Sequence, residues 1–153
     1  MKSQIETVRK TRSFLLEHIK DLSNEQFNQV VEGFNNNIVW NLGHMIAAQQ
    51  GICYKRAGLS TMISDDFWER FRSGSKPEGM VNDDEIKHIK ELLITTMDKF
   101  EDDYDKKIFG NYTAWSTRYG VELASIDDSI AFLPFHEGLH SGTITSIKKL
   151  VAK

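Results

Sequence analysis

The residues best suited to chemistry lie in one short stretch near the end of the chain, Phe135 to Ile144, which reads FHEGLHSGTI. His136 and His140 are four residues apart, so on a helix they lie about 40° apart around the axis. Two imidazoles at this spacing are a known zinc-binding arrangement, and Glu137 completes the H-E-x-x-H pattern of zinc metalloproteases. The stretch therefore indicates either a peptidase or a metal site with another purpose.

The residues after His140 argue against a peptidase. The extended protease motif continues with a glycine and a third histidine, but Thr143 and Ser146 occupy those positions. Proteases that use a downstream glutamate as the third ligand are excluded as well, because no Glu follows His140. A third ligand must therefore come from upstream.

Three histidines lie upstream, and His44 is the best candidate. His18 follows Glu17 near the end of an expected helix, and His88 lies in the charged segment EIKHIKE, so both are expected at the surface. His44 lies in NLGHMIAA, among apolar and small residues that leave room for a pocket.

The helix that carries His136 and His140 has polar residues where its apolar stripe should continue. Burial of unpaired polar groups costs several kcal/mol, and a metal ion removes that cost by taking the imidazole lone pairs. A hydrogen-bonded polar layer in the core is the alternative, and the i,i+4 pair favours metal. The stripe consists of Ile126, Ile130, Leu133, Glu137, His140, Ile144, Ile147 and Val151.

Helical periodicity dominates the rest of the chain and predicts an all-α four-helix bundle over residues 1–153, as one domain. The first helix has a stripe that Arg12 interrupts. The second runs from a cap at Asn36 or Asn37 to Gly58 and has two apolar sides, so we expect it in the centre of the fold or at an interface.

The third long helix is expected to begin after Asn82 or Asp83, and the fourth after Ser125, which forms a capping box with Asp128. Ser23 with Gln26 predicts a short capped helix, and the cluster 67–71 predicts another. The segment 106–124 is compatible with either a short hairpin or an extended loop.

Composition excludes several classes of function. The net charge of −3 gives no basic field for phosphates, so we expect no nucleic-acid partner. The longest apolar run, 130–135, is too short to cross a membrane, and residues 1–10 contain no secretory signal. The single cysteine, Cys53, excludes an internal disulfide, and we expect a cytoplasmic protein.

Two separated motifs resemble the DinB-like family of metal-dependent enzymes. One is NNNIVWNLGHMIAAQQ (35–50), and the other is GVELASIDDSIAFLPFHEGLHSGTI (120–144). The resemblance implies an up-down-down-up four-helix bundle, often a homodimer, with zinc or nickel held by His44, His136 and His140. Some relatives are transferases or isomerases that use a low-molecular-weight thiol, mycothiol or bacillithiol. Thr143 stands where the family often has Gln.

These observations predict an enzyme that uses a divalent metal on three histidines to activate a thiol or water, for transfer or hydrolysis on a small molecule. A non-catalytic bundle, in which the metal is structural, is the alternative. Glu137 could act as a general base or orient a histidine. Candidate walls of the substrate pocket are Trp40, Tyr54, Trp115, Arg118 and Tyr119.

Overall fold

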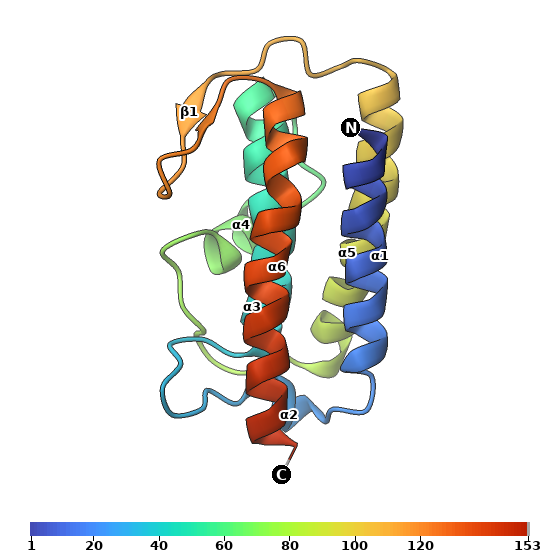
Figure 1. The fold of residues 1–153 in the computed structure, drawn as a ribbon. Coiled ribbons are helices and arrows are strands. Elements are labelled where there is room, and N and C mark those ends of the chain that lie inside the picture. The colour runs from blue at the N-terminus through green and yellow to red at the C-terminus, as the bar shows by residue number, and fades with distance from the viewer. Residues whose placement is uncertain (153) are drawn as a thin grey trace.

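The computed structural model describes residues 1–152 and confirms the all-α class (Figure 1). Its four long helices are α1 (Lys2–His18), α3 (Ile38–Gln49), α5 (Asp83–Asp105) and α6 (Ile126–Val151). The shorter helices α2 (Asn24–Asn28) and α4 (Asp65–Phe71) lie in the connections. An antiparallel hairpin of β1 (Trp115–Ser116) and β2 (Glu122–Leu123) lies between α5 and α6, so the segment 106–124 contains a hairpin.

The four long helices form a closed square of neighbours. α1 packs against α5 and α6, and α3 packs against the same two helices on the other side. In Figure 1, α1 and α6 run downwards while α3 and α5 run upwards. α3 and α6 therefore lie side by side and antiparallel, and residues near the middle of each meet.

The helices begin at the side-chain caps that the sequence indicates. Asn37 accepts a hydrogen bond from the backbone N–H of Trp40, and Asn82 and Ser23 form complete capping boxes. Ser125 caps α6, but the Asp128 carboxylate accepts from the N–H of Ala124 instead of from that of Ser125 itself. These caps satisfy N–H groups that have no partner within the helix, and they fix where each helix starts.

α3 is buried on all sides within its own chain. Leu42 and Met45 on one side and Ala47 on the other are all fully inaccessible. The short helices α2 and α4 pack on α3 in addition to α5 and α6, so its two apolar sides need no second chain to cover them.

α3 continues into a π-helical segment, η1 (Gln50–Tyr54), and a 3-10 turn, η2 (Lys55–Ala57). Gly58 ends the turn in the left-handed conformation, with φ of 70°. The π segment has more residues per turn than an α-helix, so side chains beyond Gln49 point in directions that an α-helical wheel does not give.

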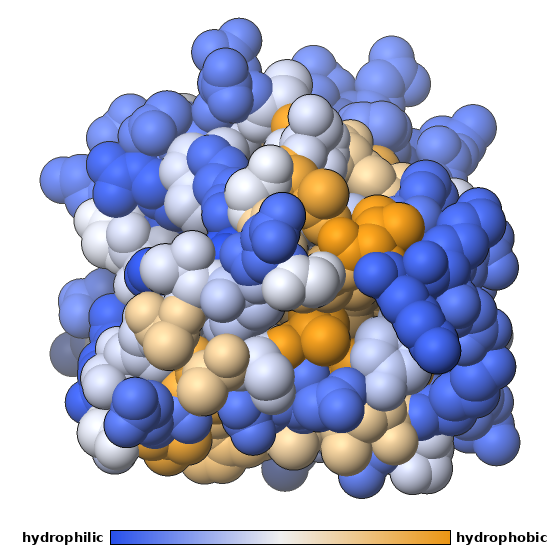
Figure 2. All heavy atoms as spheres, turned by 90° about the horizontal axis from the view of Figure 1, so that it is seen from above, coloured by the Kyte–Doolittle hydropathy of each residue, from blue (hydrophilic) through white to orange (hydrophobic). Residues whose placement is uncertain are grey.

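Figure 2 looks down on the end of the bundle where α5 finishes and α6 begins, and shows apolar atoms among hydrophilic ones. A cavity of about 390 Å³ lies at this end, lined in part by Tyr104, Phe109 and Ile126. Among the described residues, no helix is long and apolar enough to span a bilayer.

Candidate metal site

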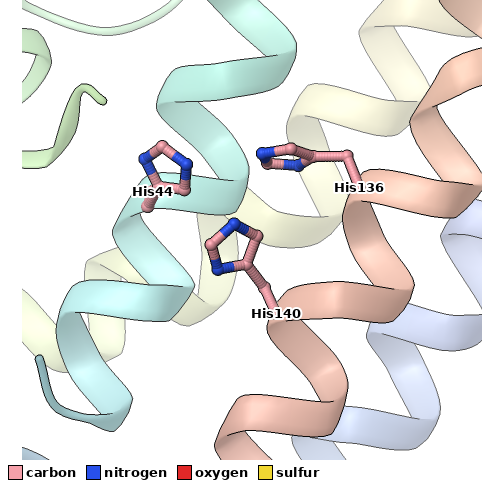
Figure 3. A group of neighbouring side chains, drawn as sticks. All are labelled: His44, His136 and His140. Carbon is pink, nitrogen blue, oxygen red and sulfur yellow. The ribbon is translucent and has the colours of Figure 1, made fainter. Parts of the chain in front are cut away.

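His44 on α3 and His136 and His140 on α6 face one another in the interior of the bundle (Figure 3). One nitrogen from each ring can be chosen so that all three lie within 4.8 Å of one another. The ring centroids of His140 are 4.6 Å from those of both His44 and His136. The cluster is largely buried, with His44 6% and His136 9% exposed.

His44 is oriented by the end of α4 and by its own helix. Its Nδ1 lies 2.8 Å from the backbone carbonyl oxygen of Phe71, which can only accept, so Nδ1 carries the proton and Nε2 keeps a free lone pair. The ring of Trp40, one turn earlier, stacks on His44 at 4.8 Å and 7°. The Phe71 carbonyl therefore fixes the tautomer of the His44 imidazole, and the Trp40 ring fixes its plane.

Gly43 lets α4 come close enough to make that contact. A Cβ atom at position 43 would lie 2.4 Å from the Phe71 ring, which is closer than real contacts allow. Glycine next to His44 therefore lets Phe71 pack directly on α3 and bring its carbonyl to the imidazole.

His140 is oriented in the same way by a side chain of α3. Its Nδ1 lies 2.8 Å from Oδ1 of Asn41, whose amide nitrogen donates to Asn36 and to the carbonyl of Asn37. Those two acceptors fix which way the Asn41 amide points, so its oxygen accepts from the imidazole. Nε2 of His140 is therefore also left with a free lone pair.

His136 completes the cluster without a hydrogen-bond partner of its own. Its Nδ1 is buried and has no hydrogen-bond partner among the described residues. Burial, followed by the neighbouring His140 and His44, lowers the pKa of His136 to about 2. Burial also lowers the pKa of His140 to about 4 and that of His44 below its ordinary value.

The donor set fits a divalent cation such as Zn²⁺ or Ni²⁺. All three imidazoles are neutral near pH 7, two have a lone pair fixed by a bond at the opposite nitrogen, and the third lacks a partner that an ion would supply. Within residues 1–152, the group includes no fourth His, Cys, Asp or Glu. Three protein ligands with open positions are typical of catalytic zinc sites.

Glu137 lies between the two α6 histidines in sequence, but its carboxylate is bound by Arg12 of α1. Arg12 Nη2 and Nε donate to the two oxygens at 2.7 and 3.1 Å, and the side chains are 0% and 1% exposed. This is the arginine that interrupts the apolar stripe of the first helix. A general-base role for Glu137 gains no support from this geometry, because both oxygens are engaged on the core side of α6.

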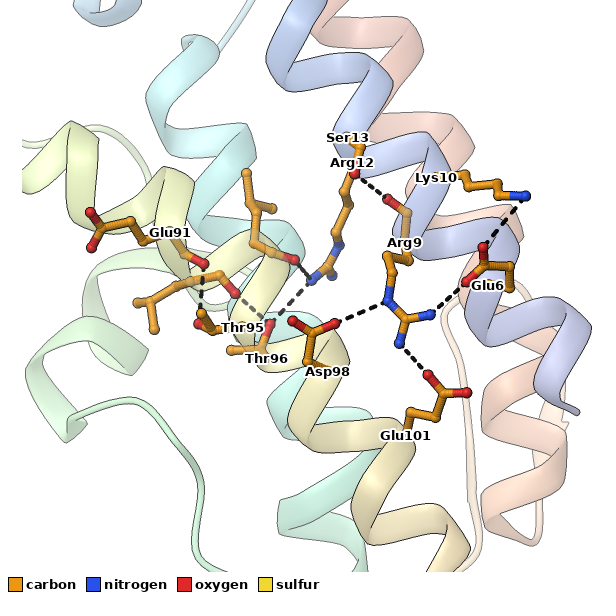
Figure 4. Close-up of polar contacts among 12 residues, drawn as sticks. Glu6, Arg9, Lys10, Arg12, Ser13, Glu91, Thr95, Thr96, Asp98 and Glu101 are labelled. Carbon is orange, nitrogen blue, oxygen red and sulfur yellow. Dashed lines mark hydrogen bonds and ion pairs between the residues drawn. The ribbon is translucent and has the colours of Figure 1, made fainter.

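Arg12 also contacts the other two long helices. It donates to the carbonyls of Met45 on α3 and Leu93 on α5, at 3.2 and 3.0 Å. It also donates to Oγ1 of Thr96 on α5 at 3.3 Å (Figure 4). One guanidinium thus joins all four long helices at the level of the histidines, and it fixes how α6 is rotated.

The structure brings some of the expected pocket residues to the cluster and not others. Trp40 stacks on His44, and the positive charge of Arg118 reaches all three imidazoles, where it contributes to lowering each pKa. Tyr119 packs against Phe132 and Phe135 of α6.

Tyr54 and Trp115 are engaged elsewhere. The Tyr54 hydroxyl donates to Asp103 of α5 at 2.8 Å, and its ring packs on Phe109. The Trp115 ring lies under the guanidinium of Arg56, and its Nε1 donates to the Tyr112 hydroxyl. Neither residue forms a hydrogen bond or a ring contact with a histidine of the cluster, and a role for them as walls of a substrate pocket stays a prediction.

The remaining histidines and the cysteine lie outside the cluster, as the sequence indicates. His88 is exposed and borders a separate cavity of about 390 Å³ between α4 and α5. Cys53 is buried, and burial raises the pKa of its thiol, so it is unsuited to ligation or nucleophilic attack.

Three contributors to the site were not foreseen: Asn41, Arg12 and the carbonyl of Phe71. Asn41 is a polar residue in the middle of an apolar helix, which is a usable signal. Arg12 and Glu137 both interrupt apolar stripes with opposite charges, which could have suggested the pair. The Phe71 carbonyl is a backbone atom and has no signature in the sequence.

An all-α bundle with a buried three-histidine cluster between two antiparallel helices is thus the class that the fold and site define. The family model of the DinB superfamily matches residues 7–144, and the chain belongs to that superfamily. The match includes all three histidines. Among curated proteins, the comparison found none that matches.

Proposed function

We propose that the protein is a metal-dependent enzyme whose divalent cation is held by His44, His136 and His140. The observation that carries the proposal is the convergence of three neutral imidazoles with no fourth ligand residue in the group within residues 1–152. When bound, such a cation lowers the pKa of a water or thiol and so activates it as a nucleophile for transfer or hydrolysis.

The chain's own residues would position the site. Phe71 and Asn41 hold the protons of two imidazoles away from the centre of the cluster, so that the lone pairs face inward. Trp40 fixes the plane of His44, and the buried Arg12–Glu137 pair fixes the rotation of α6. These contacts are made by the protein's own residues, which favours a geometry set by the protein.

The resemblance to thiol-using relatives supports a low-molecular-weight thiol as cosubstrate and a small molecule as acceptor. We propose a homodimer from the family resemblance alone. The two apolar sides of α3 are covered within one chain, so they give no separate argument for a dimer.

Metal titration tests the shared premise. The purified apoprotein should bind one Zn²⁺, Ni²⁺ or Co²⁺ per chain, and alanine at any of the three histidines should abolish high-affinity binding. His18→Ala and His88→Ala are matched controls that should bind like the parent. Asn41→Leu should weaken binding by about 10–100-fold, because it removes the acceptor that orients His140. Unchanged binding in the three alanine variants would refute the site.

Turnover separates the enzyme from the non-catalytic alternative. The metal-loaded protein would be screened for transfer with bacillithiol, mycothiol and glutathione, and for ester and amide hydrolysis. Stoichiometric metal and raised thermal stability, with no turnover in any arm, would favour a bundle in which the metal is structural.

A further inference from the structure

The turn of the β1–β2 hairpin spans from one side of the histidine cluster to the other. Arg118 Nη2 donates to Oγ of Ser73 at 3.0 Å, two residues beyond the Phe71 carbonyl that holds His44. Tyr119, the next residue, meets the Phe135 ring edge-on at 5.2 Å, and Phe135 immediately precedes His136. Two consecutive residues thus contact one segment that lies two residues from the support of His44 and another that directly precedes His136.

Hydrogen bonds within the turn stabilise its conformation. The backbone N–H of Thr117 donates to the Val121 carbonyl at 2.9 Å, and the Thr117 hydroxyl accepts from the N–H of Val121 at 3.2 Å. Gly120 takes the left-handed conformation that closes the turn, with φ of 74°. The direction in which Arg118 leaves the turn is therefore set by backbone bonds.

The charges around the cluster do not balance. The carboxylate of Glu137 is paired with Arg12, and histidines that ligate a metal are neutral. Arg118 adds a positive charge next to the segment that holds His44, and within residues 1–152 it forms no salt bridge with a carboxylate. A divalent cation adds two more positive charges, so the loaded site would lack a compensating anion.

We propose that Arg118 selects an anionic small molecule, of the class of carboxylate-bearing thiols, by pairing its guanidinium with the carboxylate while the thiol enters the histidine cluster. This inference rests on the proposed metal site and deepens it. Arginine suits the role because its planar donors match a carboxylate and keep their charge at any physiological pH. The Ser73 hydroxyl is a neutral acceptor, so a carboxylate would compete with it favourably.

The test uses Co²⁺-loaded protein, whose visible absorption reports on a thiol entering the site. Three small thiols serve as probes: mercaptoacetate carries a negative charge, 2-mercaptoethanol none, and cysteamine a positive one. In the parent protein, mercaptoacetate should bind more tightly than 2-mercaptoethanol. Arg118→Met should weaken mercaptoacetate by about tenfold or more, and 2-mercaptoethanol by less than about twofold. Because each thiol is compared with itself in two proteins, differences in thiol acidity cancel.

Arg72→Met is the matched control, since Arg72 is an exposed arginine from the same region and is paired with Glu69. Arg72→Met should leave the affinities for all three thiols unchanged. That result would show that the loss of a positive charge near the site is not enough to weaken the binding of mercaptoacetate. Arg118→Lys, which keeps the charge but not the planar fork, should recover part of the preference. Should Arg118→Met fail to load Co²⁺, the comparison of the lysine variant with the parent, for each thiol in turn, still decides the question.

Two negative results are distinguishable. A parent protein that binds no Co²⁺ would overturn the metal site and the inference with it. A parent that binds Co²⁺ and takes mercaptoacetate and 2-mercaptoethanol equally, or an Arg118→Met variant that keeps the preference, would overturn the role of Arg118 alone.

Discussion

Glu137 and Arg12 show how one residue in a motif can serve the core instead of the chemistry. A buried ion pair contributes little net stability, but loss of one partner leaves an uncompensated buried charge. Arg12→Met should therefore lower the free energy of unfolding by about 3–5 kcal/mol, measured by denaturant titration of the apoprotein. The double variant Arg12→Met/Glu137→Met should recover most of that loss.

Arg9, one turn before Arg12, is the control for this experiment. It pairs with Glu6, Asp98 and Glu101 at the edge of α1 and α5 (Figure 4), and its side chain is 20% exposed. Arg9→Met should cost about 1 kcal/mol or less, because solvent screens such pairs. If Arg9→Met and Arg12→Met lower the free energy of unfolding equally, the buried pair of Arg12 with Glu137 matters no more for stability than the partly exposed pairs of Arg9.

At this scale the sequence predicted the three histidines and failed on their partners. His44 could be chosen over His18 and His88 because burial follows from neighbouring residue types. The partner of Glu137 lies 125 residues away in sequence, and which of two polar interruptions meet depends on helix rotation. The general-base reading of Glu137 came from the motif, whereas the side of α6 on which its oxygens lie is a property of packing.

The placement of α4 decides the tautomer of His44, because the Phe71 carbonyl at the end of α4 contacts Nδ1 of His44. Gly43→Ala should push Phe71 off α3, since the added Cβ would lie 2.4 Å from its ring. We expect a loss of about 1–3 kcal/mol of unfolding free energy, as for overpacked cores, together with weaker metal binding. Calorimetry with and without metal measures both quantities.

Gly138→Ala is the counterpart on α6, where a Cβ meets nothing within 4 Å. It should stabilise the protein by up to about 1 kcal/mol through helix propensity. Destabilisation by Gly138→Ala, or tolerance of Gly43→Ala with unchanged metal affinity, would contradict this account of how α4 packs.

The long helices and most of their caps were predictable because both depend on local sequence. The contacts of Tyr54 and Trp115 could not be predicted in this way. Tyr54 lies at the end of the π-helical segment Gln50–Tyr54, where α-helical geometry no longer gives the direction of a side chain. The position of Trp115 follows from the path of the hairpin, which depends on tertiary contacts.

The whole molecule should lose stability as the pH falls below about 6.5. Imidazoles of the unfolded chain gain protons near pH 6.5, whereas folding lowers the pKa of His140 to about 4 and that of His136 to about 2. Over that interval the unfolded state binds more protons, so the free energy of unfolding decreases with decreasing pH. The stability is complete above pH 6.5 and is lost progressively toward those lower values.

Thermal unfolding of the apoprotein between pH 7 and pH 5, above the range where most carboxylates titrate, measures this effect. His136→Gln and His140→Gln should each flatten the dependence, and His88→Gln, at an exposed position, should not. Equal slopes in all four proteins would contradict the assigned protonation. Bound metal should steepen the dependence, because protons compete for the same lone pairs.

The guanidinium of Arg12 meets all four long helices at the depth of the histidines, and this has a consequence for the order of events. Turning α6 enough to separate its histidines from His44 would expose or unpair a buried charge, so the arrangement is reached only when the bundle closes. We therefore expect assembly to precede loading, so that an arriving ion would bind to a bundle that has already closed.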